Sequence, residues 1–201
     1  MDYKEKTKLF KVRSTIIEML TDRKYTIPDE ILSINLQQFM AQYDNNNINF
    51  YINDDNKPTY VYFYIDNKSF TKNDFKNIHT KITEEYDTAV KILIIIKDKI
   101  PSSTKVELVK LIYSNVQIFS HNELTFNITK NYLVPRHILL NEDEKKKVYK
   151  KYNTTDNTIF QKILITDPVA KYYSMSIGDL CRIVRPSPSS GICINYRAVT
   201  N

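Results

Sequence analysis

Glycine is scarce in this chain, since Gly178 and Gly191 are the only two among 201 residues. Glycine enters left-handed backbone conformations at little steric cost, so a chain this poor in glycine indicates where it needs one. Four of the seven prolines lie in the same stretch: Pro135, Pro168, Pro186 and Pro188. Because proline also fixes the backbone, residues 133–199 are predicted to contain the most constrained turns of the protein.

Cysteine is equally scarce, and the two that occur, Cys181 and Cys193, are not closely spaced. This spacing excludes a disulfide framework and a thiolate metal site, and it indicates a reducing compartment. Both cysteines fall on neighbouring predicted strands, where we expect core or edge thiols. No apolar run approaches 18 residues and no N-terminal signal pattern occurs, so we expect a soluble intracellular protein with no membrane partner.

An excess of acidic charge is also missing, because the formal net charge is +6. Residues 1–130 carry 18 basic and 17 acidic side chains, whereas residues 131–201 carry 11 and 6. A basic excess favours nucleic acid or an acidic protein face as partner. Five lysines follow Asn141 and Glu144, which form the pattern of a helix capping box. A solvated helix face is the preferred interpretation of that lysine run.

The C-terminal stretch predicts a short helix followed by a β-hairpin. Asp167 can cap a helix that has Pro168 at its first position, and the helix should continue to Tyr172. Gly178 then marks a turn. The elements predicted after it are, in order, a strand over 180–185, a loop by composition over 186–191 and an antiparallel strand over 192–199.

The residues of this stretch also match a known family. The matching positions are Asp167-Pro168-Val169-Ala170-x-Tyr172, Gly178, Arg182-Ile183-Val184-Arg185-x-Ser187-x-Ser189-x-Gly191 and Tyr196-Arg197, with Leu133-Val134-Pro135-Arg136-His137-Ile138 upstream. This pattern resembles the C-terminal signature of the fifth subunit shared by the eukaryotic nuclear RNA polymerases, a family that also has an archaeal form. The signature is long and includes both glycines, so it is specific. The family usually has glycine where this chain has Ser174 and threonine where it has Ser189.

The resemblance implies that the C-terminal module docks on the largest polymerase subunit. The candidate docking residues are Tyr172, Arg185, Ser187, Ser189, Gly191, Tyr196 and Arg197. Arginine and tyrosine combine a broad flat surface with hydrogen-bonding capacity, which suits interface anchors. Since Arg185 ends one strand and Tyr196 and Arg197 lie on the other, we expect the three to be neighbours across the hairpin. An alternative is that the arginine stems only cover the hairpin.

The N-terminal part alternates between helix and strand patterns. Leu9, Val12, Ile16 and Leu20 recur at helical spacing, and the run over 90–96, which is apolar except for Lys91, suits a strand covered on both faces. The other predicted elements are helices over 36–43, 75–86 and 106–113 and strands over 60–65 and 116–119. This order indicates a layered α/β domain. The resemblance continues at Ile17-Glu18-Met19-Leu20-x-Asp22-Arg23-x-Tyr25, which is similar to the opening helix of the eukaryotic form.

No catalytic constellation stands out in the sequence. The three histidines are scattered, and candidate metal ligands are not clustered. One enzyme hypothesis rests on Asp66-Asn67-Lys68 at a strand end, with Asp54 and Asp55 upstream, a short motif found in metal-dependent nucleases. A polar strand terminus explains these residues equally well. We therefore expect no catalytic residues, no metal and no cofactor.

The candidate for DNA contact is the segment Pro101-Ser102-Ser103-Thr104-Lys105. Proline and hydroxyl side chains before a helical pattern indicate a helix N-terminus, whose free N–H groups suit a phosphate. A plain N-cap explains the composition as well. The resemblance favours DNA, because the family's N-terminal jaw approaches downstream DNA with a similar Pro-Ser loop.

The sequence thus predicts an α/β protein with a layered α/β jaw domain over 1–128 and a small α+β assembly domain with a β-hairpin over 129–201. The predicted function is that of a non-catalytic subunit of a multisubunit DNA-directed RNA polymerase. Its expected partners are the largest subunit, other subunits and downstream double-stranded DNA. The alternatives are a free-standing nucleic-acid-binding module and a metal-dependent nuclease. The expected location is the nucleus for a cellular source, or host cytoplasm and virion for a viral one.

Overall fold

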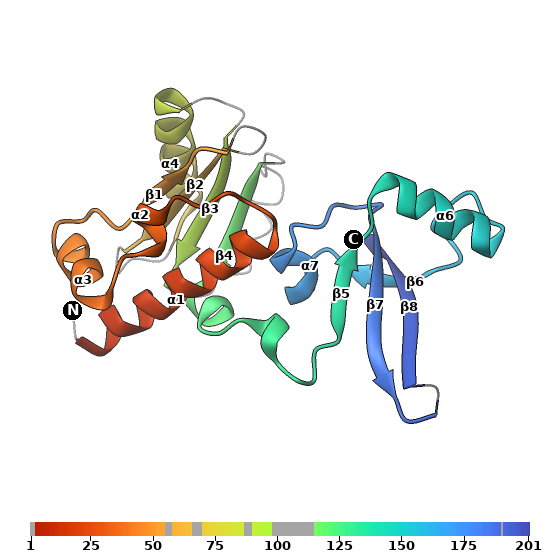
Figure 1. Cartoon of the computed structure of the whole chain (residues 1–201). Coiled ribbons are helices and arrows are strands. Elements are labelled where there is room, and N and C mark those ends of the chain that lie inside the picture. The colour runs from red at the N-terminus through yellow and green to blue at the C-terminus, as the bar shows by residue number, and fades with distance from the viewer. Residues whose placement is uncertain (1–2, 55–57, 66–69, 87–89, 98–114, 190) are drawn as a thin grey trace. The chain divides into compact units, whose positions relative to one another are not determined.

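The chain forms two compact units, Met1–Phe126 and Asn127–Asn201. A computed structural model describes residues 3–54, 58–65, 70–86, 90–97, 115–189 and 191–201. Within these residues each unit contains one four-stranded sheet with helices (Figure 1). The predicted mixed α/β fold is confirmed. We call the two parts the N-terminal unit and the C-terminal unit.

The N-terminal unit has a mixed sheet with strand order β1-β2-β3-β4. Its elements are α1 (Tyr3–Asp22), α2 (Asp29–Leu32), α3 (Leu36–Asp44), β1 (Phe50–Ile52), β2 (Thr59–Tyr64), α4 (Lys72–Glu85), β3 (Lys91–Ile96), β4 (Val116–Ser120) and the 3₁₀ helix η1 (His121–Leu124). Strand β1 is antiparallel to β2, while β2, β3 and β4 run parallel. The helix predicted over 106–113 falls outside the described residues.

Strand β3 lies in the centre of this sheet and is buried along both faces. Ile92, Ile94 and Ile96 pack with the apolar side of α4. The alternate residue Leu93 lies on the opposite face, in register with Gln117 of β4. Gln117 accepts a 3.0 Å hydrogen bond from Arg23, just after the end of α1, which places this end of α1 against that second face. The strand predicted to be covered on both sides is confirmed.

The C-terminal unit has strand order β5-β7-β8-β6. Its elements are the 3₁₀ helix η2 (Ile128–Lys130), β5 (Arg136–Leu139), α6 (Glu142–Tyr152), β6 (Gln161–Leu164), α7 (Pro168–Tyr172), β7 (Leu180–Ser187) and β8 (Gly191–Thr200). Strand β7 is antiparallel to both neighbours, and the short edge strand β6 runs parallel to β8. Strand β6 was not predicted, because its four residues place only Ile163 in the core and so show little alternation.

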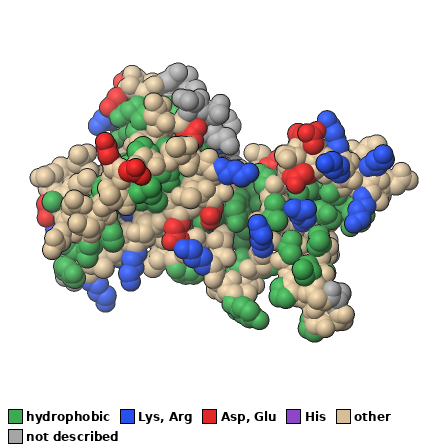
Figure 2. Space-filling view, viewed as in Figure 1, with side chains coloured by type: hydrophobic (Ala, Val, Ile, Leu, Met, Phe, Trp, Pro, Cys, Tyr) green, Lys and Arg blue, Asp and Glu red, His purple; other side chains and the backbone are tan. Residues whose placement is uncertain are grey.

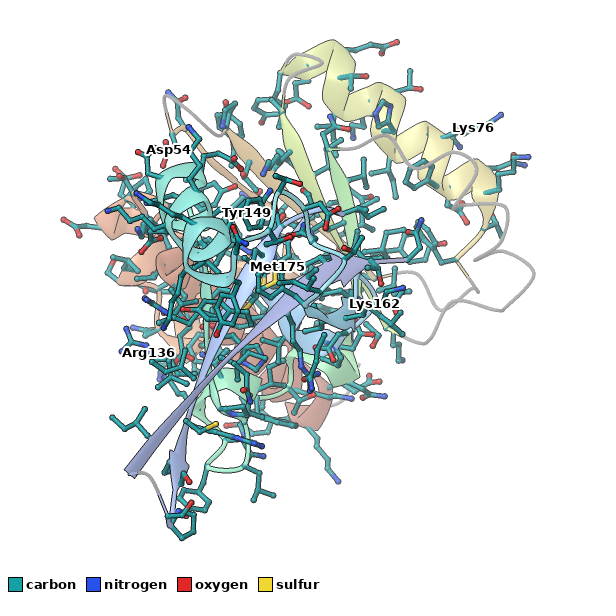
Figure 3. All side chains as sticks on the ribbon, turned by 90° about the vertical axis from the view of Figure 1, so that its right-hand side faces the viewer. Asp54, Lys76, Arg136, Tyr149, Lys162 and Met175 are labelled. Atoms are coloured by element: carbon teal, nitrogen blue, oxygen red, sulfur yellow. The ribbon has the colours of Figure 1, made fainter. Side chains whose placement is uncertain are left out.

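The two faces of this sheet have different helical covers. On one face Leu180 and Ala198 pack with Val148 of α6, and Tyr149 lies against the same cluster. On the other face Cys181, Ile183 and Val199 pack with Ala170 of α7 and with Met175. Tyr149 and Met175 are labelled in Figure 3. The alternation of apolar residues along β7 and β8 therefore supplies two cores, one for each helix.

The β7–β8 hairpin is longer than predicted. Pairing continues through Pro186↔Ile192 and Ser187↔Gly191, so the predicted loop over 186–191 is wrong at its ends. Both glycines have positive φ, +90° at Gly178 and +69° at Gly191. The expectation that the two glycines mark constrained backbone is confirmed.

Candidate functional site

Arg185 and Arg197 lie on one face of the C-terminal sheet. In the β7–β8 register Arg185 pairs with Cys193, and Cys181 pairs with Arg197. Since alternate residues of a strand point to the same side, both arginines share the face covered by α7. Tyr196 pairs with Arg182 and therefore lies on the opposite face. The expectation that the three side chains are neighbours across the hairpin is therefore wrong: Tyr196 lies on the other face, and Arg185 and Arg197 share a face but lie four positions apart along the ladder.

The two arginines line a pocket of about 300 Å³. Its apolar lining comes from Leu133, Val134, Pro135, Ile163, Val169 and Ile183, and its polar lining comes from His137, Asp167, Arg185, Asn195 and Arg197. An apolar surface with guanidinium groups at its border suits a polypeptide segment that combines apolar and acidic side chains. We call these residues the β7–β8 pocket.

Short-range hydrogen bonds fix the walls of the β7–β8 pocket. The Asp167 carboxylate accepts a 2.8 Å bond from the backbone N–H of Val169 and so caps α7, as predicted. The ring Nδ1 of His137 lies 2.7 Å from the carbonyl oxygen of Pro135. The side chain of Asn131 accepts a hydrogen bond from the N–H of Leu133, and Leu133, which lines the pocket, is 82% exposed. This exposed leucine is a ready apolar contact for a partner.

The positive charge of the protein belongs to the C-terminal unit. Residues 127–201 contain 12 lysines and arginines against 6 acidic residues, whereas residues 1–126 contain 17 of each. Figure 2 shows basic side chains over α6. The capping box of α6 is confirmed, because Asn141 and Glu144 exchange side-chain and backbone hydrogen bonds. This basic excess suits an acidic protein face or nucleic acid.

The remaining docking candidates occupy three different environments. Tyr172 is buried, and its hydroxyl accepts a 2.9 Å hydrogen bond from the Asn127 amide. Tyr196 contacts the rings of Phe160 and Tyr152 on the α6 face. A third group lies at the end of the hairpin and consists of Ser187, Ser189 and Gly191. Tyr172 and Tyr196 thus have internal packing partners, whereas Ser189 and Gly191 are exposed.

Two sequence candidates lie outside the described residues. They are the proposed DNA segment Pro101–Lys105 and the Asp66-Asn67-Lys68 motif. Asp54, which belonged to the nuclease hypothesis, accepts a 3.2 Å hydrogen bond from the backbone N–H of Thr26.

Cys181 and Cys193 are free thiols on the neighbouring strands β7 and β8, as predicted. Burial raises the pKa of the Cys181 thiol to about 11, which keeps it protonated near neutral pH. In the part of the chain that the structure describes, no three histidine, cysteine or acidic side chains gather as metal ligands.

Sequence reasoning missed a buried arginine in the N-terminal unit. Arg13 lies on the apolar side of α1, four residues after Leu9 and three before Ile16, and it is 3% exposed. It lines a second pocket, of about 210 Å³. The signal was present in the sequence, because a charged residue at this spacing interrupts the apolar stripe of the helix.

Comparison with known proteins finds both domains of one family. Residues 3–82 match "RNA polymerase Rpb5, N-terminal domain", and residues 126–199 match "RNA polymerase Rpb5, C-terminal domain".

Among the described helices, none is long and apolar enough to cross a bilayer.

Similar proteins span nearly the whole chain. The DNA-directed RNA polymerases I, II, and III subunit rpabc1 of Dictyostelium discoideum is 30% identical over 196 residues, which cover 94% of this chain and 96% of that protein. The RPABC1 subunit of Caenorhabditis elegans is 26% identical over 98% of each chain. DNA-directed RNA polymerase subunit 5 of Acanthamoeba polyphaga mimivirus is 32% identical over 62% of this chain and 58% of that protein. The chain therefore belongs to the Rpb5 family of DNA-directed RNA polymerase subunits and contains both domains of that family.

Proposed function

We propose that this subunit docks on the largest subunit of its polymerase through the β7–β8 pocket, and that its N-terminal unit forms part of the jaw that holds downstream DNA. Membership of the Rpb5 family supports docking on another polymerase subunit, because by family the chain is a non-catalytic polymerase subunit with other subunits as partners. The observation that selects the surface is the position of Arg185 and Arg197 at one apolar pocket.

The β7–β8 pocket has the properties of an interface anchor. Arg185 is exposed and Arg197 is half-buried, and both line the pocket together with Ile163 and Ile183. Arginine stems can cover apolar surface while the guanidinium group stays available to a partner. Arginine at a partly desolvated site pairs with carboxylates through two parallel hydrogen bonds. The proposed complement on the largest subunit is a segment with apolar side chains flanked by acidic ones.

The experiment is a pull-down of the tagged full-length chain from cells that contain its polymerase. In the double variant Arg185→Glu/Arg197→Glu, recovery of the largest subunit should fall at least tenfold, because two attractive contacts become repulsive. The matched control is Arg136→Glu, an exposed arginine on β5 that lies in register with Val184 and so belongs to the opposite face (labelled in Figure 3). Equal recovery with both variants would refute docking through this pocket.

The jaw contact is assigned to Pro101–Lys105 on the strength of the Pro-Ser pattern and the family. Changing Ser102 and Ser103 to alanine and Lys105 to glutamate should make elongation complexes dissociate at lower salt, without preventing assembly. Contacts to phosphate are individually small and screened by ions, so the difference should be visible in a salt titration. If the variant complexes match wild type at every ionic strength, the segment is only a helix cap.

A further inference from the structure

The pocket of the N-terminal unit is built around a buried guanidinium group. Arg13 projects from α1 and is 3% exposed, although it carries a full positive charge. The pocket of about 210 Å³ that it lines is bordered by Glu30, Ile31, Ile34, Gln42, Asn47, Ile48, Asn49 and Phe50. These residues come from α1, from α2 and the turn after it, from α3, from the segment that leads into β1 and from the first residue of β1. We call this site the Arg13 pocket.

The protein itself uses only part of the hydrogen-bonding capacity of the Arg13 guanidinium group. One N–H donates a 2.9 Å hydrogen bond to the carbonyl oxygen of Ile31, and the ring of Phe50 lies 5.2 Å from the guanidinium carbon. A guanidinium group has five N–H donors. Across residues 3–54, 58–65, 70–86, 90–97 and 115–126, no carboxylate comes within 4.0 Å of Arg13. Glu30 is also a lining residue of this pocket, and it forms no ion pair with Arg13.

The remaining N–H donors of Arg13 still reach solvent through the pocket, because none of them is among the fully buried side-chain atoms of the described residues that lack a hydrogen-bond partner. Burial removes much of the water around the guanidinium group, and one carbonyl with one ring face does not replace all of it, so the charge carries a desolvation cost. Burial lowers the pKa of Arg13, in agreement with this cost. A carboxylate that enters the pocket would use the remaining donors in the bidentate geometry that arginine favours.

The size of the Arg13 pocket restricts what can enter. Pockets for drug-sized molecules and cofactors enclose about 300–1,000 Å³, so about 210 Å³ is small for such a ligand. A single side chain of a polypeptide fits this scale. Gln42, Asn47 and Asn49 add neutral polar residues to the lining, and the Asn49 side-chain oxygen already accepts a 2.7 Å hydrogen bond from the Phe63 N–H. We propose that the Arg13 pocket receives the carboxylate of an aspartate or glutamate side chain from a partner polypeptide.

The proposal can be tested on the isolated full-length chain by NMR. The probes are the peptide acetyl-Gly-Glu-Gly-amide and its neutral match acetyl-Gly-Gln-Gly-amide, and the observable is the side-chain Nε–Hε signal of Arg13. The glutamate peptide should shift this signal in a saturable manner at millimolar concentration, and the glutamine peptide should not. The signal is assigned by its loss in Arg13→Met. Arg23→Met, at a position just after α1 and outside the pocket, should keep the response.

Glu30 offers a second variant of the Arg13 pocket that leaves the buried residues unchanged. Glu30 is exposed, so Glu30→Gln should fold normally, and removal of its competing charge should tighten binding of the glutamate peptide about two- to fivefold. The melting temperature of Arg13→Met should equal or exceed that of wild type, because an apolar isostere replaces an incompletely paired charge.

Three results would overturn the proposal. The first is an equal response to both peptides, or no response to either. The second is an equal shift with inorganic phosphate, which would make the pocket a general anion site. The third is a clearly lower melting temperature for Arg13→Met together with no peptide response, which would assign Arg13 a structural role. The proposal does not depend on the β7–β8 pocket, so the pull-down and this titration can fail independently.

Discussion

At the scale of single residues, Cys181 makes the stability of the C-terminal unit depend on pH. Its side chain is fully buried on β7, and burial raises its thiol pKa from 9.0 to about 11. In the unfolded chain the thiol loses its proton at lower pH than in the folded protein. Between these two values the folded state therefore holds the extra proton, and the free energy of unfolding must fall as pH rises.

We predict that the C-terminal core loses up to about 2–3 kcal/mol of stability between pH 9 and 11 through this thiol. Chemical denaturation at pH 8 and pH 10.5 should show a smaller loss of unfolding free energy in Cys181→Ala than in wild type, because the variant lacks this thiol. Every other titrating group is present in both proteins, so its contribution cancels in the comparison. At pH 8 a thiol reagent should label the half-buried Cys193 quickly and Cys181 only on unfolding. Rapid labelling of both thiols would contradict the buried position of Cys181.

At the scale of elements, the shortage of glycine appears in how the helices end. Residues in the left-handed region follow α1, α3, α6 and α7, at Lys24, Asn46, Asn153 and Ser174, with φ between 50° and 66°. At each of these ends the next residue donates a backbone hydrogen bond to the carbonyl five positions earlier; after Ser174, for example, Met175 N–H bonds to Ala170. This is the helix ending that usually employs glycine. Asparagine tolerates it, whereas lysine and serine adopt it at a cost.

We predict that Lys24→Gly and Ser174→Gly each raise the free energy of unfolding by about 0.5–1 kcal/mol. The gain is the relieved left-handed strain, reduced by the greater entropy of glycine in the unfolded chain. Urea denaturation of the full-length protein measures it. Lys24→Ala serves as the control, because alanine meets the same steric strain as lysine. If alanine and glycine stabilise equally, the backbone conformation is not the cause.

Gly191 presents the converse case at the start of β8. It has φ +69° and pairs with Ser187, and apart from Gly191 and its two chain neighbours no heavy atom lies within 4 Å of the position that a Cβ would occupy. Space is therefore available, and only the backbone conformation resists a side chain. We predict that Gly191→Val destabilises the protein by about 1–2 kcal/mol, while Gly191→Asn costs less than half as much. Thermal denaturation measures the destabilisation caused by each variant. Similar values for the valine and asparagine variants would show that the positive φ of Gly191 is not the cause.

At the scale of the whole molecule, the two units differ in charge and in core. The N-terminal unit is neutral overall, whereas the C-terminal unit carries the entire net charge of +6. The C-terminal unit also has its own two cores on the faces of one sheet. Independent folding of this unit is therefore expected, and its stability should depend on where the chain is cut.

We predict that a fragment of residues 127–201 unfolds cooperatively and is about 1 kcal/mol or more stable than a fragment of residues 131–201. The longer fragment keeps Asn127, which donates to the buried hydroxyl of Tyr172, and the η2 turn that packs near α7. Chemical denaturation of both fragments provides the comparison. A gradual, non-cooperative transition of the longer fragment would show that the C-terminal unit needs its neighbour.

Local signals in the sequence determined most of the elements. Asp167-Pro168 specified the start of α7, and Asn141 with Glu144 specified the start of α6, because capping is a contact between residues two or three positions apart. The apolar run of β3 specified a strand buried on both faces. The ordered C-terminal signature identified the Rpb5 family, which the comparisons confirm.

Only the tertiary structure decided which side chains meet. Register places Arg185 and Arg197 on one face and Tyr196 on the other, and a shift of one residue in pairing would have reversed this. The short strands β1 and β6 exist because neighbouring strands supply their hydrogen bonds, so their own residues show little pattern. The burial of Arg13 depends on α2, α3 and Phe50, which are distant in sequence. Patterns along the chain record contacts within a few residues, whereas pockets arise from contacts between segments that only folding brings together.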